Sequence, residues 1–357
     1  MSNNNLKIVP RHEVEQAAWD SFVNNCDEAW LWHLYDFQDA ISTWPGKSDL
    51  SFAIKENGSQ EILAVVPLHI TKEKIYHVIS WDKLDSMGGP AFKNKIGDSF
   101  RQKLISTILA HLQNIAEKQG AVEINIALSP MAPASRGEKC PQTNPLLKMK
   151  CENTLTQTWV IDLRQGEKNI WDGMEKRARN AVRKAEKMNV ICRLANQDSD
   201  LDAYYRLHSE TYGRSAINPH PKDYFKAIWT DFYAKDLALI LVAEINGEIV
   251  AADNFGIYKN AAIYWTGASS QKGLESQAGS LLQWIAMRHM IENSLEWYET
   301  GEAFPHVQEG KLKGLNDFKQ EFGGKLYPYY RGRFIFKRKA NWVYQSLSNL
   351  KKALFVE

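Results

Sequence analysis

One order of predicted elements occurs twice along the 357-residue chain. In each half, strands joined by a hairpin precede a loop, a long amphipathic helix and a further strand. The hairpin turns are Asn57-Gly58 and Asn246-Gly247, whose residue types tolerate the positive φ of a two-residue turn. The long helices are expected at about Asp98–Gln119 and Ala278–Asn293. The repeated order predicts an α/β (α+β) fold of two domains in tandem, each a mixed, mostly antiparallel sheet flanked by helices.

Length supports the same division, because one domain typically holds roughly 100–200 residues. The segment from Ser129 to Pro145 is rich in Pro, Gly, Ser and Lys, which is typical of a domain junction. We therefore expect a first domain at 1–145 and a second at 146–339. An amphipathic helix is predicted at 340–357, where it packs against the second domain or makes a peripheral contact with an anionic membrane.

Composition excludes several classes of protein. Apolar residues make up 44% and charged residues 24%, which is the balance of a folded globular chain. The net charge of +2 is too small to mark a general nucleic-acid binder, so any basic site must be local. The four cysteines form no C-x-x-C pair, so we expect reduced thiols and no metal site. No stretch is apolar enough for a secretory signal or a membrane helix, and we expect a cytoplasmic protein.

A helix predicted over Lys168–Met188 carries the clearest local charge pattern. Lys176, Arg179, Arg183 and Lys187 lie three or four residues apart and therefore share one side of the helix. Arginine offers paired donors that suit phosphate oxygens. The pattern predicts a cradle for the phosphates of a nucleotide, a lipid pyrophosphate or a tRNA backbone, with a merely solvated helix face as the alternative.

Short motifs carry a resemblance to a known family. They are Arg179-Asn180-Ala181-Val182-Arg183-Lys184-Ala185, Thr211-x-x-Arg214, Ser280-Leu281-Leu282-Gln283-Trp284, Asn316-Asp317-Phe318-Lys319-x-x-Phe322-Gly323 and, in the first half, Gly89-Pro90. In this order they resemble the Fem-type (FemAB-like) aminoacyltransferases, which are tandem pairs of acetyltransferase (GNAT) folds. The resemblance implies two GNAT-like domains, the second of which carries most of the site. It also implies transfer of an aminoacyl or acyl group to an amine.

The resemblance further implies a co-substrate, aminoacyl-tRNA or acyl-CoA, and no tightly bound cofactor. The acetyl-CoA signature Gln/Arg-x-x-Gly-x-Gly/Ala is missing, since neither Gln271 nor Gln277 has glycine three residues later. Small residues still precede a helix N-terminus there, which favours an anion. Gln277, Gly279 and Ser280 are therefore the candidate donor-binding residues.

Three residues are candidates for catalysis. Asp253 lies in a strand of otherwise apolar or small residues, where burial would raise its pKa towards that of a general base. A salt bridge is the alternative for Asp253. Lys319, by the resemblance, points at the acyl group, where a cation stabilises negative charge on the carbonyl oxygen, and a surface lysine with a buried stem is the alternative. Glu299, near the end of a strand, is a candidate together with Glu302 and His306 for deprotonating the acceptor ammonium or gripping it, with a simple polar loop as the alternative for each.

Four further residues complete the candidate substrate site: Arg214, Tyr264, Glu302 and His306. Arg214 is an expected anion contact, with a structural salt bridge as its alternative, and Glu302 and His306 could equally be parts of a polar loop. The predicted reaction is direct attack of an amine on an activated ester or thioester, without a protein nucleophile or a metal.

The favoured donor is aminoacyl-tRNA, and the acceptor is an amine on a phosphate-bearing cell-envelope precursor, either nucleotide-linked or lipid-linked. Two alternatives stay open. One is an acyl-CoA-dependent N-acetyltransferase that acts on an amino sugar in surface-polysaccharide synthesis. The other is a non-catalytic binding module on the same fold.

Overall fold

A computed structural model describes residues 6–72, 74–75, 79–214, 217–304 and 307–337. The helix predicted at 340–357 and the candidate residue His306 lie outside them. The contacts within the chain divide the described residues into two units. The first unit contains the residues up to Leu155 and those from Tyr330 onward, and the second is Thr156–Tyr329.

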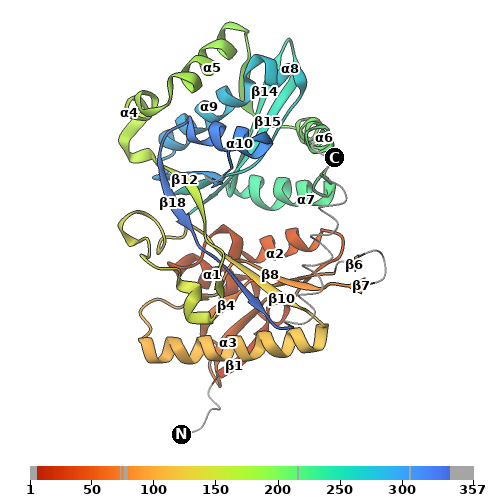
Figure 1. Cartoon of the computed structure of the whole chain (residues 1–357), viewed down its shortest axis with the longest axis vertical. Helices are drawn as coiled ribbons and strands as arrows, with labels where there is room; N and C mark the ends of the chain where they lie inside the picture. Colours follow the sequence, from red (N-terminus) through yellow and green to blue (C-terminus); the bar gives the residue numbers. More distant parts are fainter. Residues whose placement is uncertain (1–5, 73, 76–78, 215–216, 305–306, 338–357) are drawn as a thin grey trace. The chain divides into compact units, whose positions relative to one another are not determined.

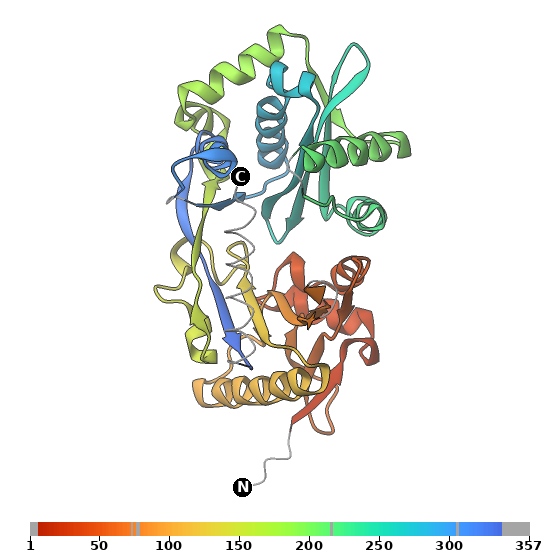
Figure 2. The same cartoon turned by 45° about the vertical axis from the view of Figure 1, so that its right-hand side comes forward.

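The first unit is built on two sheets, ordered β1-β3-β4-β9 and β11-β19-β10-β8-β5-β2, with a separate β6-β7 pair. Its core forms where Leu104, Ile108 and Leu112 of one long helix, α3, are buried among strand residues such as Leu84 and Ile126. The helix runs along the base of this unit in Figures 1 and 2. The elements are β1 (Leu6–Pro10), η1 (Arg11–Glu13), α1 (Gln16–Asn25), η2 (Leu31–His33), α2 (Tyr35–Ser42), β2 (Lys47–Asp49), β3 (Phe52–Glu56), β4 (Ile62–Val66), β5 (His69–Thr71), β6 (Lys74–Ile75), β7 (Ile79–Ser80), β8 (Lys83–Gly88), β9 (Ala91–Phe92), α3 (Asp98–Gln119), β10 (Glu123–Leu128), η3 (Gly137–Lys139), η4 (Pro145–Met149), β11 (Glu152–Asn153) and β19 (Arg331–Ile335).

A proline divides one of the predicted strands. The pattern of residues 61–70 predicts a single strand, whereas β4 ends at Val66 and β5 begins at His69. Pro67 has no N–H to donate to a ladder, and its carbonyl instead accepts a 2.5 Å bond from Ser86 Oγ. The chain therefore passes from the four-stranded sheet to the six-stranded sheet at this point.

The second unit holds one seven-stranded sheet, β13-β14-β15-β16-β17-β12-β18. Ala178 and Val182 of α5 pack with Leu282 of α9 in the core on one face of the sheet. On the other face, Tyr204 of α6 donates a 2.9 Å bond to the carbonyl of Thr266. The elements are β12 (Thr156–Asp162), η5 (Leu163–Gln165), α4 (Gly166–Gly173), α5 (Lys176–Lys187), β13 (Ile191–Leu194), α6 (Asp198–Gly213), α7 (Lys222–Ala227), η6 (Ile228–Phe232), η7 (Tyr233–Lys235), β14 (Ala238–Ile245), β15 (Glu248–Tyr258), β16 (Ala261–Ser269), α8 (Gln271–Ser276), α9 (Ala278–Glu292), β17 (Trp297–Ala303), α10 (Gly310–Gln320) and β18 (Lys325–Tyr329).

The helix predicted over residues 168–188 is two helices. The break lies at Met174, whose backbone is extended (φ −66°, ψ 148°). The Met174 side chain is nevertheless buried in the core, so the apolar spacing of the sequence continues across the break. The guanidinium of Arg179 donates to the carbonyls of Trp171, Asp172 and Met174 at the end of α4. The periodicity of apolar residues could not reveal this break, because the Arg179 side chain stabilises it from the next helix.

The domain boundaries also differ from the predicted ones at both ends of the second unit. A single aromatic strand is predicted over residues 325–336, but β18 pairs with β12 in the second unit and β19 pairs with β10 in the first. Glu152 of β11 likewise pairs with Arg333 of β19. Residues 146–155 and 330–337 therefore belong to the first unit.

Candidate active site

Two neighbouring strands of the second unit pair along only part of their length. Strands β16 and β17 run parallel from Ala261 opposite Trp297 to Ile263 opposite Glu299, which gives three residue pairs. Beyond these pairs, β16 stays with β15 and β17 stays with β12. An extra residue follows in each strand, Trp265 in β16 and Thr300 in β17, where the ladder to the outer neighbour shifts register. Such bulges bend a strand, so β16 and β17 diverge here.

Lys319 reaches the divergence from α10. Its Nζ donates a 2.6 Å bond to the carbonyl of Glu302 on β17. Gly301, with a φ of +104°, leaves the space for it, since a Cβ there would lie 3.0 Å from Nζ. One turn earlier on the same helix face, Asn316 exchanges 2.8 and 2.6 Å bonds with the backbone of Phe304. The Asn316–Lys319 spacing thus holds α10 along β17.

Two carboxylates accompany Lys319. Burial lowers the pKa of the Lys319 ammonium, and the charges of Glu299 and Glu302 oppose that shift. Glu299 is buried and accepts a 2.8 Å bond from Thr158 Oγ1. Glu302 is only half-buried. The structure therefore brings the predicted residues Lys319, Glu299 and Glu302 together.

Asp253 lies in a second polar cluster on β15. Its Oδ1 accepts a 3.1 Å bond from the Tyr264 hydroxyl, and its Oδ2 accepts a 2.9 Å bond from Gln283 Nε2. Tyr298 in turn donates to Gln283 Oε1. Burial raises the pKa of Asp253 to about 7, although the bonds from Gln283 and Tyr264 lower it. Tyr298 and Glu299 are successive strand residues, so the two clusters lie on opposite faces of β17.

Asp253 and Tyr264 bond to each other, while the catalytic role predicted for Asp253 and the substrate contact predicted for Tyr264 stay predictions. Asp253 is only 3% exposed, and both of its oxygens accept bonds from side chains. No salt bridge to Asp253 occurs among the described residues. Its carboxyl group can set the position of the Tyr264 hydroxyl, whose own pKa is raised well above its usual value by burial and by Asp253.

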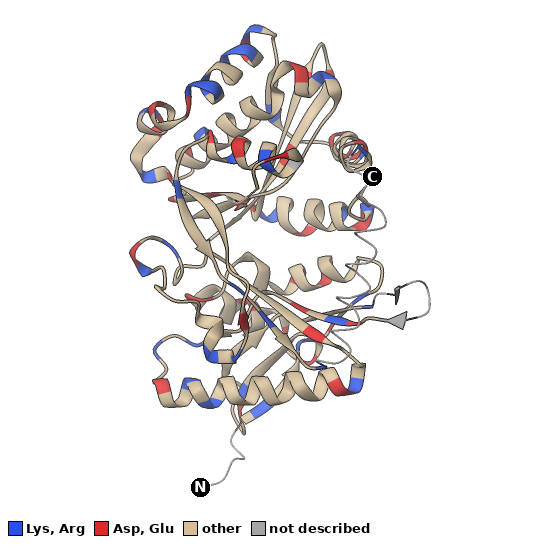
Figure 3. Ribbon diagram, in the orientation of Figure 1, with Lys and Arg blue, Asp and Glu red and all other residues tan. Residues whose placement is uncertain are grey.

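The predicted phosphate-binding cations of α5 do not all have the same environment: two are exposed to solvent and one is bonded to the end of α4. Lys176 and Arg183 are exposed on α5, and Figure 3 shows blue Lys and Arg positions recurring along this helix. Arg183 also lies over the Trp171 ring, 5.4 Å from its centroid. Arg179 instead caps α4, so its guanidinium has a structural task that the sequence pattern did not indicate.

Arg214 holds the end of β16. Its Nη2 donates 2.6 Å to the carbonyl of Ser269 and 3.1 Å to Thr211 Oγ1. Thr211 Oγ1 also accepts a 3.3 Å bond from the Ser269 amide. The Thr-x-x-Arg motif thus fixes the strand just before the predicted donor loop through hydrogen bonds to the backbone of Ser269.

The predicted donor loop is largely helical. A short helix that the sequence analysis missed, α8, fills residues 271–276, and Gln277 then adopts a left-handed φ of +62°. The Ser270 hydroxyl accepts from the Gly273 amide at 3.1 Å, and the amides of Ser280 and Leu281 bond to the Gln277 carbonyl at 3.1 and 3.3 Å. Gly279 lies at the start of α9, where a Cβ would have no neighbour closer than 4.0 Å.

Residues 173–320 match the family model of the acetyltransferase (GNAT) domain. The match covers the β16–β17 divergence, Asp253 and Lys319. The whole chain resembles the solved structure of FemX, with a TM-score of 0.68 at 15% identity over 93% of this chain and 97% of that one. It also resembles a tandem GNAT protein from the clavulanic acid biosynthesis pathway (TM-score 0.53, 10% identity, 93% and 98% covered).

A third similar structure is L-PGS from Bacillus licheniformis, with a TM-score of 0.53 at 16% identity over 88% of this chain and 94% of that one. At such identities the likeness shows the fold alone. It confirms the predicted tandem GNAT-like architecture and the resemblance to the Fem-type proteins. No curated protein sequence matches the chain.

Several residues of the site were missed by the sequence analysis. Tyr298 and Thr158 join it only through tertiary contacts, and nothing in their local sequence marked them. Gln283 lies in one of the family motifs, but the motif gave it no role in the site. Gly267 had a signal, since a glycine inside a strand often permits a close approach. A Cβ there would lie 1.8 Å from the Tyr264 hydroxyl and 2.4 Å from Asp253 Oδ1.

The described residues contain neither a metal-binding cluster nor a membrane-spanning helix. Within the described residues, no group of three or more His, Cys, Asp or Glu side chains is placed to hold a metal ion. Among the described helices, none has both the length and the apolar character needed to cross a bilayer.

Gly267→Ala should displace the Tyr264 hydroxyl and lower the free energy of unfolding by about 1–3 kcal/mol through overpacking. Gly279→Ala is the matched control, because its Cβ meets open space in a helix and should stabilise by about 0.5–1 kcal/mol. Urea unfolding followed by circular dichroism measures both variants. Equal effects of the two substitutions would contradict the close packing at Gly267.

Asp253→Asn should change how stability depends on pH. The folded pKa of Asp253 is raised to about 7, so the folded state binds one more proton than the unfolded state between about pH 4 and pH 7. Relative to the variant, the wild type should therefore lose up to about 4 kcal/mol of unfolding free energy as the pH rises through that window. Urea unfolding at a series of pH values measures it, and a constant difference would show that the carboxyl is not protonated in the fold.

Proposed function

We propose that the protein is an N-acyltransferase that moves an aminoacyl group from an activated ester on tRNA to an amine. The observation that carries this proposal is the Lys319 ammonium, held at the divergence of β16 and β17 beside two carboxylates. An acyl carbonyl placed beside Gly301 would have a cationic donor at its oxygen. A preorganised charge of this kind is usually the largest contribution to acyl transfer.

The chemistry of the site follows from these groups. The acceptor amine attacks the ester carbonyl, and the N–H donors of Lys319 that are not bonded to Glu302 stabilise the oxyanion. The new C–N bond forms, the ester C–O bond breaks, and the ribose oxygen leaves as a hydroxyl with the second proton that the attacking nitrogen loses. Glu302, half-buried, accepts the proton that the acceptor ammonium must lose. Glu299, buried and bonded to Thr158, keeps the nearby lysine charged.

The backbone of residues 270–281 supports an ester on tRNA over a CoA thioester. A CoA pyrophosphate needs amide N–H groups that point at its oxygens. The amides of Gly273, Ser280 and Leu281 already bond within the segment. The Fem-type motifs in the sequence favour the same donor. The exposed Lys176 and Arg183 support an acceptor that carries phosphate, such as a nucleotide-linked or lipid-linked cell-envelope precursor.

One observation favours a second candidate function, an acyl-CoA-dependent N-acetyltransferase that acts on an amino sugar. The family model that matches residues 173–320 is described as an acetyltransferase domain. A transfer assay separates the two functions. The protein is mixed with labelled aminoacyl-tRNA or labelled acetyl-CoA, together with a nucleotide-linked amino sugar or a nucleotide-linked peptide that bears a lysine.

We expect label to move from tRNA to the peptide amine, and no saturable binding of acetyl-CoA by calorimetry at millimolar concentration. Micromolar binding of acetyl-CoA, with transfer to the amino sugar, would establish the alternative. Saturable binding of an acceptor without transfer from either donor would point to a binding module.

Lys319→Ala should lower kcat about 10²–10³-fold, because an oxyanion donor is lost from the transition state. Lys313→Ala is the control, since Lys313 lies on the same helix and pairs with Asp317 at 2.7 Å. It should leave kcat unchanged within about twofold. Single-turnover transfer rates test both variants, and equal rates for Lys319→Ala and wild type would remove Lys319 from the mechanism.

A further inference from the structure

The first unit contains a cavity of about 400 Å³ that the proposed transfer reaction does not use. It lies at the carboxyl ends of the parallel strands β8 and β10, beside the first turns of α3. In open α/β sheets this end of the strands is the usual place for a ligand. Its volume also falls within the roughly 300–1,000 Å³ of small-molecule sites.

Apolar side chains form most of the wall. They include Phe92, Ile105, Leu128, Leu146 and Met149. Because β8 and β10 stay paired as far as Gly88 and Leu128, no chain can pass between these strands. A ligand in the cavity would therefore rest its apolar part on the strand ends and could not extend between the two strands.

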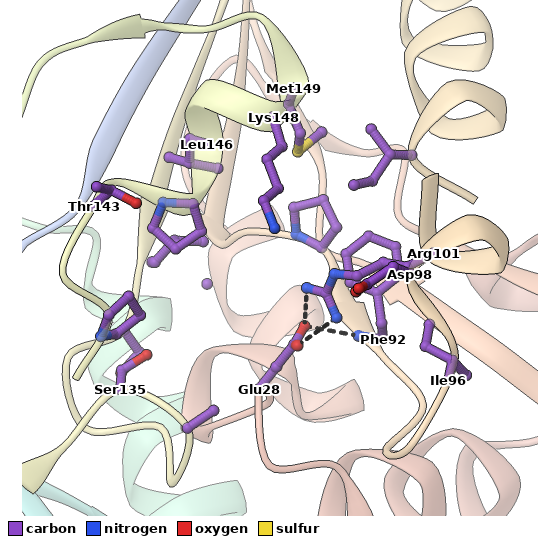
Figure 4. A pocket seen from close by; sticks show the side chains of 18 residues that line it. Glu28, Phe92, Ile96, Asp98, Arg101, Ser135, Thr143, Leu146, Lys148 and Met149 are labelled. Atoms are coloured by element: carbon purple, nitrogen blue, oxygen red, sulfur yellow. Dashed lines mark hydrogen bonds and ion pairs between the residues drawn. The ribbon is translucent and has the colours of Figure 1, made fainter. Parts of the chain in front are cut away.

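Two cations point into this space. Figure 4 shows Lys148 extending from η4 towards the side of the cavity where Arg101 lies. Arg101 donates 2.7 and 3.0 Å bonds to the two oxygens of Glu28, which leaves other N–H donors on the guanidinium. Lys148 has neither a hydrogen bond nor an ion pair with any described residue. Glu28 already neutralises Arg101, so the exposed Lys148 is the cation of this wall whose charge no described carboxylate meets, and an anion bound beside it would supply the missing partner.

The chain holds the guanidinium of Arg101 and the backbone of the short helix from which Lys148 extends. Asn144 caps η4, since its Oδ1 accepts a 3.0 Å bond from the Leu146 amide and its Nδ2 donates 2.8 Å to the carbonyl of Arg331. Arg101 lies over the Phe92 ring, 4.3 Å from its centroid, and Glu28 also accepts a 3.3 Å bond from the Phe92 amide. The Arg101 side of the site is thus preorganised, which reduces the entropy lost on binding.

We propose that this cavity binds a small amphipathic anion, in which a phosphate or carboxylate lies between Lys148 and Arg101 and a ring-sized apolar body contacts Phe92 and Leu146. Asp98, which also lines the cavity, bonds to neither cation and opposes the anion. The proposal concerns the first unit alone and does not depend on the transfer reaction.

The test uses the full chain and three probes with the same apolar body: 1-naphthyl phosphate, 1-naphthoate and neutral 1-naphthol. Calorimetric titration measures each dissociation constant. We expect saturable binding of an anionic probe, with naphthol at least about tenfold weaker because it lacks a charged hydrogen-bond acceptor. The ratio between the phosphate and carboxylate probes identifies the preferred anion.

Variants then locate the bound probe. Lys148→Gln should weaken the anionic probes about tenfold and leave naphthol unchanged. Asp98→Asn should strengthen the same probes, because a like charge is removed. Lys118→Gln is the control for Lys148→Gln, because it removes the same positive charge from an exposed residue at the far end of α3. It should leave all three dissociation constants unchanged.

Three results would overturn the proposal. They are equal binding of naphthol and the anions, unchanged binding in Lys148→Gln, and absence of binding by all three probes. Ser135→Trp provides a separate check, since a bulky side chain on the cavity wall should block every probe. A normal far-ultraviolet circular dichroism spectrum of each variant shows that lost binding is not lost folding.

Discussion

The short parallel ladder between β16 and β17 is the constraint on which the second unit depends. It stops after three residue pairs because Trp265 and Thr300 are extra residues in their strands. The resulting bulges turn the strands towards their outer neighbours, β15 and β12. Gly301 can then take a positive φ and admit the end of Lys319 from α10. The position of the ammonium group is thus a consequence of the sheet register.

The first unit repeats this topology with a different register. Its parallel strands β8 and β10 stay paired over six residues, and α3 crosses between them much as α9 follows β16. The strand ends are therefore closed, and the cavity forms beyond them. The same topology therefore gives two different results. In the second unit β16 and β17 diverge after three residue pairs, whereas in the first unit β8 and β10 stay paired and the cavity lies beyond their carboxyl ends.

Local signals in the sequence were enough for the tandem fold, the two-residue turn at Asn246-Gly247 and the bounds of α3, which ends at the left-handed Gly120. The Asn57-Gly58 pair does lie between two antiparallel strands, but residues 57–61 join them and only Gly58 of the pair has a positive φ. The burial of Asp253 also followed from its apolar strand. Local signals did not predict three other features: the break between α4 and α5, the division of β18 from β19, and the partners of Asp253. Each depends on contacts between distant segments, such as Gln283 with Asp253, and periodicity along one segment carries no information about them.

Hydrogen–deuterium exchange of the full chain tests the central claim, that the acyl donor occupies the divergence of β16 and β17. The probe is a short RNA hairpin with a tRNA-like acceptor end and a stable 3′-aminoacylamide. We predict slower amide exchange at residues 264–269 and 299–303 and along α10 when the probe is added. Slower exchange confined to other segments, or none at saturating probe, would contradict the assignment of this site.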